Sequence, residues 1–97
     1  MGNPPMINLA QIISAAPDQV SSDLGGEAVI LNLKNGTYYG LNEIGAFIWQ
    51  QIQQPQTVAT LRDRLLAEYE VEPQQCESEL LNLLSEMAAH DLIEVRP

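Results

Sequence analysis

Basic residues are scarce in this chain of 97 residues, in which four Lys and Arg stand against thirteen Asp and Glu, for a formal net charge of −9. A domain that binds nucleic acid needs Lys and Arg to replace the counterions of the phosphates. The composition therefore argues against nucleic-acid binding. The acidic excess leaves two interpretations open, a well-solvated surface or the electrostatic steering of a basic partner.

Cysteines, aromatic residues and long apolar runs are also few. Cys76 is the single cysteine, which excludes an intrachain disulfide and agrees with a reducing compartment. No run of roughly eighteen apolar residues predicts a membrane span, and no basic segment precedes an apolar one as in a secretory signal. We therefore expect a cytoplasmic protein whose one domain has an aliphatic core.

Side chains that carry catalysis do not come together along the sequence. Cys76 and His90 are fourteen positions apart on one predicted helix, which separates them by about 21 Å and excludes a nucleophile and base pair. A metal site would need three or four ligands. The glycines match no phosphate-binding spacing, and no base pairs with the carboxylates of Glu68, Glu70, Glu72, Glu77 and Glu79. We expect no enzyme activity, no metal and no cofactor.

The segment 31–49 carries the strongest structural signals. Asn35-Gly36 favours a two-residue type I′ hairpin turn, because both residues tolerate positive φ. Asn42 precedes an apolar helical rhythm and is typical of an N-cap. A second hairpin signal is Gly25-Gly26. The chain is thus predicted to form three antiparallel strands, over 19–24, 27–33 and 37–41, while residues 1–18 form an N-terminal arm or short strand beside a domain of residues 19–97.

The two turns predict the register of these strands, with Leu24 opposite Glu27 and Lys34 opposite Thr37. Side chains on opposed residues share a face of the sheet. One face holds Val20, Ser22, Val29, Leu31, Leu33, Tyr38 and Gly40, and the other holds Ser21, Asp23, Ala28, Ile30, Asn32, Thr37, Tyr39 and Leu41. The first face is the more apolar, so we expect it to cover the core.

Three helices are predicted after the strands, over 43–53, from a Thr57 cap to 69, and over 73–90. The third is longer than a small sheet needs and is apolar over a wide face. It is either buried on two sides or lines a groove beside the last strand. That strand, 37–41, has no charge and no proline to protect its edge. Such an edge is either covered by the protein's own chain or open to another.

The run Gly36-Thr-Tyr-Tyr-Gly-Leu-Asn-Glu-Ile-Gly45, followed by Ile48-Trp49, resembles the family of the pyrroloquinoline quinone biosynthesis protein PqqD. The resemblance extends over about residues 20–95. Asp91 departs from it, because the family often has Gly there, and this puts the C-cap of the last helix in doubt. A milder departure is Glu79, where the family often has Asp.

The resemblance implies an α+β, winged helix-turn-helix fold of three strands and three helices that binds the leader of a ribosomally made precursor peptide. The leader would add to the third strand and pack on the third helix. By position, the implied peptide-binding residues are Thr37, Tyr38, Tyr39, Gly40 and Leu41 of the strand and Glu77, Leu80, Leu81, Leu84 and Ala88 of the helix.

The implied role is that of a non-catalytic adaptor that presents the leader to a processing enzyme. The segments Val-Ser-Ser-Asp-Leu, from Val20, and Glu-Tyr-Glu-Val-Glu-Pro, from Glu68, resemble the stand-alone recognition proteins of lasso peptide pathways, whose partner is a leader peptidase. The alternatives are a precursor chaperone for a radical SAM enzyme of quinone biosynthesis, a winged-helix DNA-binding regulator, and a homodimer that pairs through the same edge strand.

Overall fold

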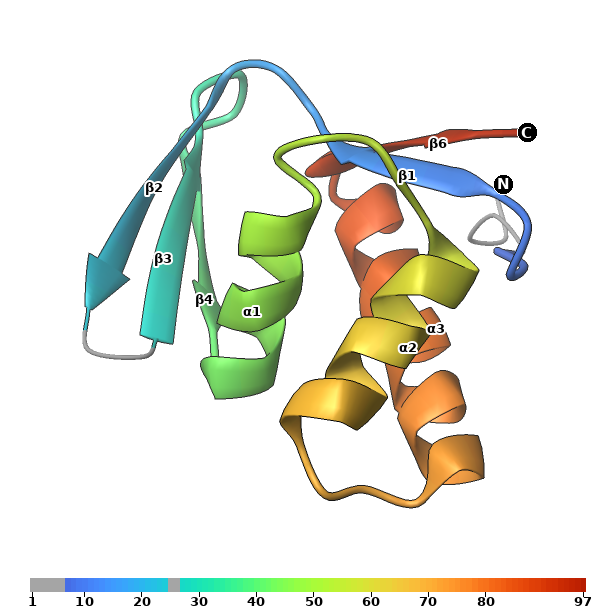
Figure 1. Cartoon of the computed structure of the whole chain (residues 1–97). Coiled ribbons are helices and arrows are strands. Elements are labelled where there is room, and N and C mark those ends of the chain that lie inside the picture. Colours follow the sequence, from blue (N-terminus) through green and yellow to red (C-terminus); the bar gives the residue numbers. More distant parts are fainter. Residues whose placement is uncertain (1–6, 25–26) are drawn as a thin grey trace.

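The computed structural model describes residues 7–24 and 27–97, which form two small antiparallel sheets and three α-helices (Figure 1). This confirms the predicted α+β class and is compatible with a winged helix-turn-helix. The strands are β1 Ile12–Ala15, β2 Gln19–Leu24, β3 Glu27–Asn32, β4 Thr37–Leu41, β5 Gln56–Thr57 and β6 Ile93–Arg96, and the helices are α1 Glu43–Gln51, α2 Val58–Glu68 and α3 Pro73–Ala89. Within the described residues, no helix is long and apolar enough to cross a membrane.

The three predicted strands form one sheet in the order β2-β3-β4. Leu24 pairs with Glu27, as predicted. The Gly25-Gly26 turn between them lies outside the described residues. In the second hairpin the predicted pairing of Lys34 with Thr37 is wrong, because Asn32 pairs with Thr37 and residues 33–36 form the loop.

Asn32 explains why this second loop is longer than a two-residue turn. Its side chain is buried, and its amide nitrogen lies 3.4 Å from the carbonyl oxygen of His90, to which it donates. Its Oδ1 accepts from the Lys34 amide at 2.9 Å. Gly36 alone in the loop has positive φ, at 69°, so the turn is not type I′. The strand pairing ends where Asn32 enters the interior.

The prediction of which sheet face covers the core is also wrong. The shifted pairing differs by two residues and leaves every side chain on its predicted face, but the face with Ala28, Ile30 and Asn32 is the buried one. Val20 and Tyr38, on the supposed core face, are 52% and 69% exposed. Alternation identifies two faces, but the position of α1 decides which one is buried. This helix starts directly after β4 and contacts β3, and its Ile48 belongs to the same core cluster as Ile30.

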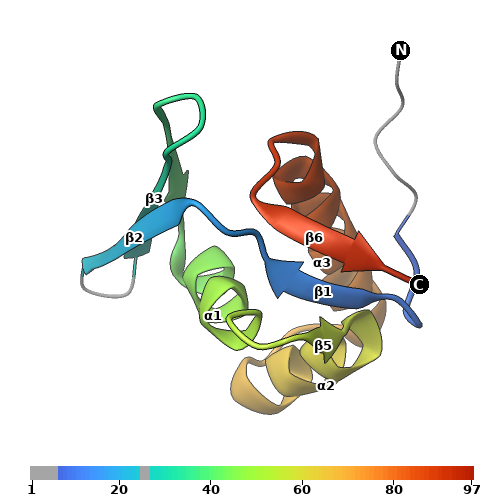
Figure 2. The ribbon, with the colours of Figure 1, turned by 90° about the horizontal axis from the view of Figure 1, so that it is seen from above.

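The second sheet, in the order β5-β1-β6, lies across the ends of the helices (Figure 2). β1 is its central strand, and Ile13 is fully buried. For residues 1–18 the sequence left two possibilities open, an arm or a short strand. The structure shows that part of this segment is the short strand β1. β6 accounts for the C-terminal residues, since Ile13 pairs with Val95.

Side chains cap the helices as the sequence predicts. Asn42 Oδ1 accepts from the Gly45 amide at 2.9 Å, and Thr57 Oγ1 accepts from the Thr60 amide at 3.1 Å. A Cβ on Gly45 would lie 3.1 Å from the Leu41 Cβ, so glycine permits the close turn from β4 into α1. The predicted helices extend one or two residues beyond the observed ends at Gln51, Glu68 and Ala89.

The C-cap of α3 is well formed, although Asp91 stands where the family often has Gly. Asp91 adopts the left-handed conformation at φ 59°. The Leu92 amide donates to the Met87 carbonyl at 2.9 Å, and the Asp91 amide donates to the Ala88 carbonyl at 3.1 Å. This is a complete Schellman cap, formed with Asp where Gly is the usual residue.

Candidate peptide-binding groove

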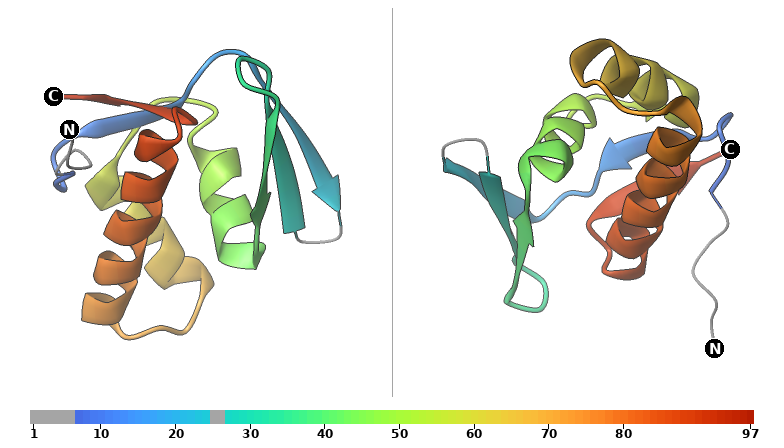
Figure 3. Two further views of the ribbon diagram at one scale, coloured as in Figure 1. Left: turned by 180° about the vertical axis from the view of Figure 1, so that it is seen from behind. Right: turned by 90° about the horizontal axis from the view of Figure 1, so that it is seen from below.

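β4 is an edge strand of its sheet, and the edge that does not pair with β3 faces the C-terminal half of α3. Within the described part of the chain, β4 pairs only with β3. The rings of Tyr39 on β4 and His90 at the end of α3 lie 4.9 Å apart between centroids, with their planes at 45°. The view from below shows β4 and α3 on opposite sides of α1 (Figure 3, right). One ring contact therefore joins the two elements at one end.

A groove of about 330 Å³ runs between β4 and α3. Its β4 wall is formed by consecutive residues of the strand and its α3 wall by residues one helical turn apart. The lining residues are Tyr38, Tyr39, Gly40, Leu41, Leu83, Glu86, Met87, His90 and Leu92. The groove thus offers an unpaired strand edge on one side and a mixed apolar and polar helix face on the other.

A smaller and mainly apolar pocket of about 60 Å³ lies nearer the N-terminus of α3. Leu83 belongs to its wall and to that of the groove, so the two hollows are neighbours. The pocket is lined by Ile44, Ile48, Leu65, Tyr69, Val71, Cys76, Glu79, Leu80 and Leu83. Phe47 supports this end, because its ring meets that of Tyr69 edge-on at 5.7 Å.

The electrostatics of both hollows are acidic. Glu86 lines the groove, Glu79 lines the pocket, and within the described residues neither hollow has a Lys or Arg in its wall. Burial, followed by the nearby charges of Glu43 and Glu68, raises the pKa of Tyr69. Burial, with a further contribution from Glu79, raises the pKa of the Cys76 thiol. Cys76 is therefore a protonated, apolar wall residue at neutral pH and not a reactive thiolate.

The structure brings most of the predicted strand residues to the groove. Tyr38, Tyr39, Gly40 and Leu41 line it, whereas Thr37 is exposed beside the hairpin loop. Tyr39 and Leu41 are half-buried on the inner face, and Gly40 has open space where a side chain would be. Whether these residues bind a peptide stays a prediction.

The predicted helix residues are not brought to this groove. Glu77 lies on the side of α3 that faces α2, where its carboxylate accepts a hydrogen bond from Arg62 of α2 at 3.3 Å. Leu80 and Leu84 are 2% and 0% exposed within the core, although Leu80 contributes to the small pocket. Leu81 and Ala88 are half-buried and pack against the core. None of the five lines the groove.

The α3 residues that line the groove are Leu83, Glu86, Met87 and His90. Helical periodicity does group Leu83 with Met87, as one stripe of the wide apolar face. The sequence does not show on which side of α3 the strand β4 lies, so it cannot tell whether the stripe with Leu83 or the stripe with Leu81 lines the groove. No local signal placed His90 beside Tyr39, because their contact joins residues 51 positions apart in the sequence.

The described residues contain no group of three or more His, Cys, Asp or Glu side chains that could hold a metal ion. Cys76 lies in the wall of the small pocket and His90 in that of the groove. Among the described residues, the site combines the edge of β4 that pairs with no other strand, an apolar pocket, and Glu79 and Glu86 in the walls.

The chain is similar to several known proteins. A profile of the family described as "Coenzyme PQQ synthesis protein D (PqqD)" matches residues 27–93. A search of curated proteins found no match. The solved structure "TbiB1 in Complex with the TbiA(beta) Leader Peptide" is 31% identical in sequence, with a TM-score of 0.78, over 84% of this chain and 94% of that one.

A second solved structure, "Lasso peptide synthetase B1 complexed with the leader peptide", shares the fold. Its TM-score is 0.74 at 23% identity, over 84% of this chain and 96% of that one. The family profile covers more than half of the chain and includes β3, β4 and all three helices. The chain therefore belongs to the PqqD family.

Proposed function

We propose that this protein is a non-catalytic adaptor that binds the leader segment of a ribosomally made precursor peptide and presents it to a leader peptidase of a lasso peptide pathway. The observation that carries the proposal is the free edge of β4 facing a groove. The 31% identical relative is a complex with a leader peptide, which supports the same class of ligand here.

The leader would add to β4 as a further strand. Backbone hydrogen bonds along an edge give affinity that depends little on sequence, and alternate side chains give specificity. The five residues of β4 span about 17 Å at the rise of a β-strand. The groove therefore holds about five leader residues in extended conformation.

The groove walls determine which leader sequences fit. Side chains that point toward α3 meet Leu83 and Met87 and should be apolar at every second position. One of them, at the Leu83 end, would enter the small pocket. Side chains that point away meet solvent and carry little specificity.

Scanning the leader with N-methyl groups tests this mode of binding without changing the protein. Each synthetic leader peptide, taken from the precursors encoded beside this chain's gene, carries one N-methylated amide, and its Kd is measured by fluorescence anisotropy. Strand addition predicts losses of about tenfold or more at alternate amides and small effects between them. Uniform insensitivity, or no binding of any unmodified leader below millimolar concentration, contradicts the proposal.

A further inference from the structure

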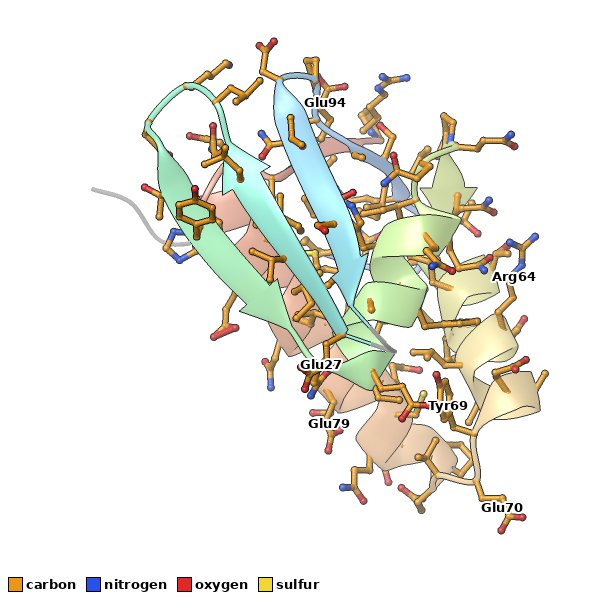
Figure 4. The ribbon with its side chains drawn as sticks, turned by 90° about the vertical axis from the view of Figure 1, so that its left-hand side faces the viewer. Glu27, Arg64, Tyr69, Glu70, Glu79 and Glu94 are labelled. Carbon is orange, nitrogen blue, oxygen red and sulfur yellow. The ribbon has the colours of Figure 1, made fainter. Side chains whose placement is uncertain are left out.

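The outer face of the β2-β3-β4 sheet, opposite the core, carries exposed apolar side chains. Val20, Leu31 and Tyr38 are paired across the three strands in one row, and Val29 and Gly40 are paired in the next. Figure 4 shows this face toward the viewer, with Glu27 at the lower end of the sheet. We call it the outer sheet face and define it by Val20, Val29, Leu31 and Tyr38 of the strands, together with Leu33, the exposed loop residue after β3 whose amide donates to the Asp18 carbonyl at 3.0 Å.

The composition of the outer sheet face is unusual for a surface. An antiparallel sheet with one solvated face normally alternates apolar residues inward with polar residues outward. Val20, Leu33 and Tyr38 are instead 52%, 57% and 69% exposed. Among the described residues, the other large apolar side chain with comparable exposure is Val71, at the small pocket. Contiguous exposed apolar side chains mark interaction surfaces.

We propose that the outer sheet face docks the processing enzyme that acts on the peptide held in the groove, an inference that rests on the proposed function. β4 connects the two surfaces: Tyr39 and Leu41 point to the core side, and Tyr38 points to the outer sheet face. An enzyme on this face therefore lies beside the same strand to which the leader adds. Tyr38 borders both the outer sheet face and the groove, so an enzyme docked on this face has the bound leader directly beside it.

Size and charge favour such an enzyme over a second copy of this chain. The three strands span roughly 10 Å across and 17 Å along, which is small for a permanent interface and suits a transient one. Two copies would each bring a net charge of −9, which opposes self-association. Glu27 and Asp18 are exposed at the two ends of the face, and Lys34 accompanies Asp18 near the loop. The fitting partner has an apolar centre with basic side chains at its margin.

The test uses the double variant Val20→Thr, Leu33→Gln. Neither residue lines the groove, Thr keeps the β-branched shape on β2, and Leu33 lies in a loop. The purified leader peptidase encoded beside this chain's gene cleaves the precursor peptide with and without the adaptor. Leader Kd, thermal unfolding and oligomeric state are measured on the same samples. Ala67→Gln, an exposed substitution on α2, is the matched control.

We expect the double variant to bind the leader within twofold of the wild type and to lose at least tenfold of its acceleration of cleavage. The Ala67→Gln control should keep both. Equal acceleration by wild type and double variant overturns the proposal, and so does a wild type that binds the leader but accelerates nothing. A wild-type dimer that the double variant converts to a monomer assigns the face to self-association and also overturns it. If the wild type fails to bind the leader, the proposed function is refuted instead. In that case, the direct binding of the purified peptidase to the wild type and to the double variant still tests the outer sheet face.

Discussion

Tyr39 of β4 and His90 at the end of α3 close one end of the groove, where their ring centroids lie 4.9 Å apart. Edge and tilted aromatic pairs contribute about 0.5–1.5 kcal/mol beyond the burial of their surface. A double-mutant cycle with Tyr39→Ala and His90→Ala should therefore give a coupling energy of about 0.5–1 kcal/mol in urea unfolding. Phe47→Ala, at the opposite end of the site, should show no coupling with His90→Ala. Additive Tyr39 and His90 effects would mean that the contact does not connect the two elements.

Two leucines of α3 distinguish the helix wall seen in the structure from the one that the sequence predicts. Leu83 lines both the groove and the small pocket, and Leu81, two residues earlier, lines neither. Leu83→Ser should weaken leader binding about tenfold or more, because it removes an apolar contact at the centre of the site. Leu81→Ser should leave leader Kd within about twofold while costing comparable stability, since both side chains are half-buried. Anisotropy titrations of the leader with both variants measure this difference. A larger loss of affinity in Leu81→Ser than in Leu83→Ser would favour the helix wall predicted from the sequence.

Asn32 holds the β3-β4 hairpin to the end of α3. Its side chain is 1% exposed, donates to the His90 carbonyl and accepts from the Lys34 amide. Asn32→Asp keeps the acceptor but loses the donor and buries a charge, so the free energy of unfolding should fall by about 1–3 kcal/mol. Asn35→Ala, which removes an exposed bond to the Thr37 amide, should cost less than about 1 kcal/mol. Equal losses in chemical denaturation would show that burial at Asn32 matters little.

Asp91 occupies a left-handed backbone position that favours glycine. A non-glycine residue there costs roughly 1–2 kcal/mol, part of which Asp recovers. Asp91→Gly should therefore raise the free energy of unfolding by about 0.5–1 kcal/mol, although glycine also makes the unfolded chain more flexible. Ser85→Gly, inside α3, should destabilise by about 0.5 kcal/mol. A loss of stability in Asp91→Gly would indicate that its side chain, and not its φ of 59°, decides the cap.

The buried thiol of Cys76 should make the protein less stable at alkaline pH. Burial raises the pKa of its thiol in the folded state above the ordinary value of 9.0. The unfolded state therefore loses its proton first, and the stability that the protonated thiol contributes declines as the pH rises from about 9 through the folded pKa. Melting temperatures from pH 7 to pH 11 should fall, and Cys76→Ala should reduce the slope. Tyr69, whose pKa burial raises above the ordinary value of 10.0, contributes to the slope that remains. Identical slopes in both proteins would exclude the thiol as the cause.

Local signals predicted the three strands of the β2-β3-β4 sheet and the three helices. Asn42 and Thr57 cap their helices because a side-chain oxygen three residues before an unpaired amide suffices. The period of two assigned each strand side chain to its correct relative face, even though the second hairpin is shifted by two residues. The uncharged edge of β4 was readable for the same reason, since it needs only the composition of five consecutive residues.

The sequence by itself therefore determined the α+β class, the helix starts, the β2-β3-β4 order and the bare edge strand of this PqqD family member. The tertiary structure decided which sheet face is buried, because α1 covers the Ile30 side and leaves Val20 and Tyr38 exposed. It also decided that Leu83 and His90, and not Leu81, face β4. Periodicity groups residues into stripes and faces, but only the packing of elements distant in sequence selects the stripe that meets a partner.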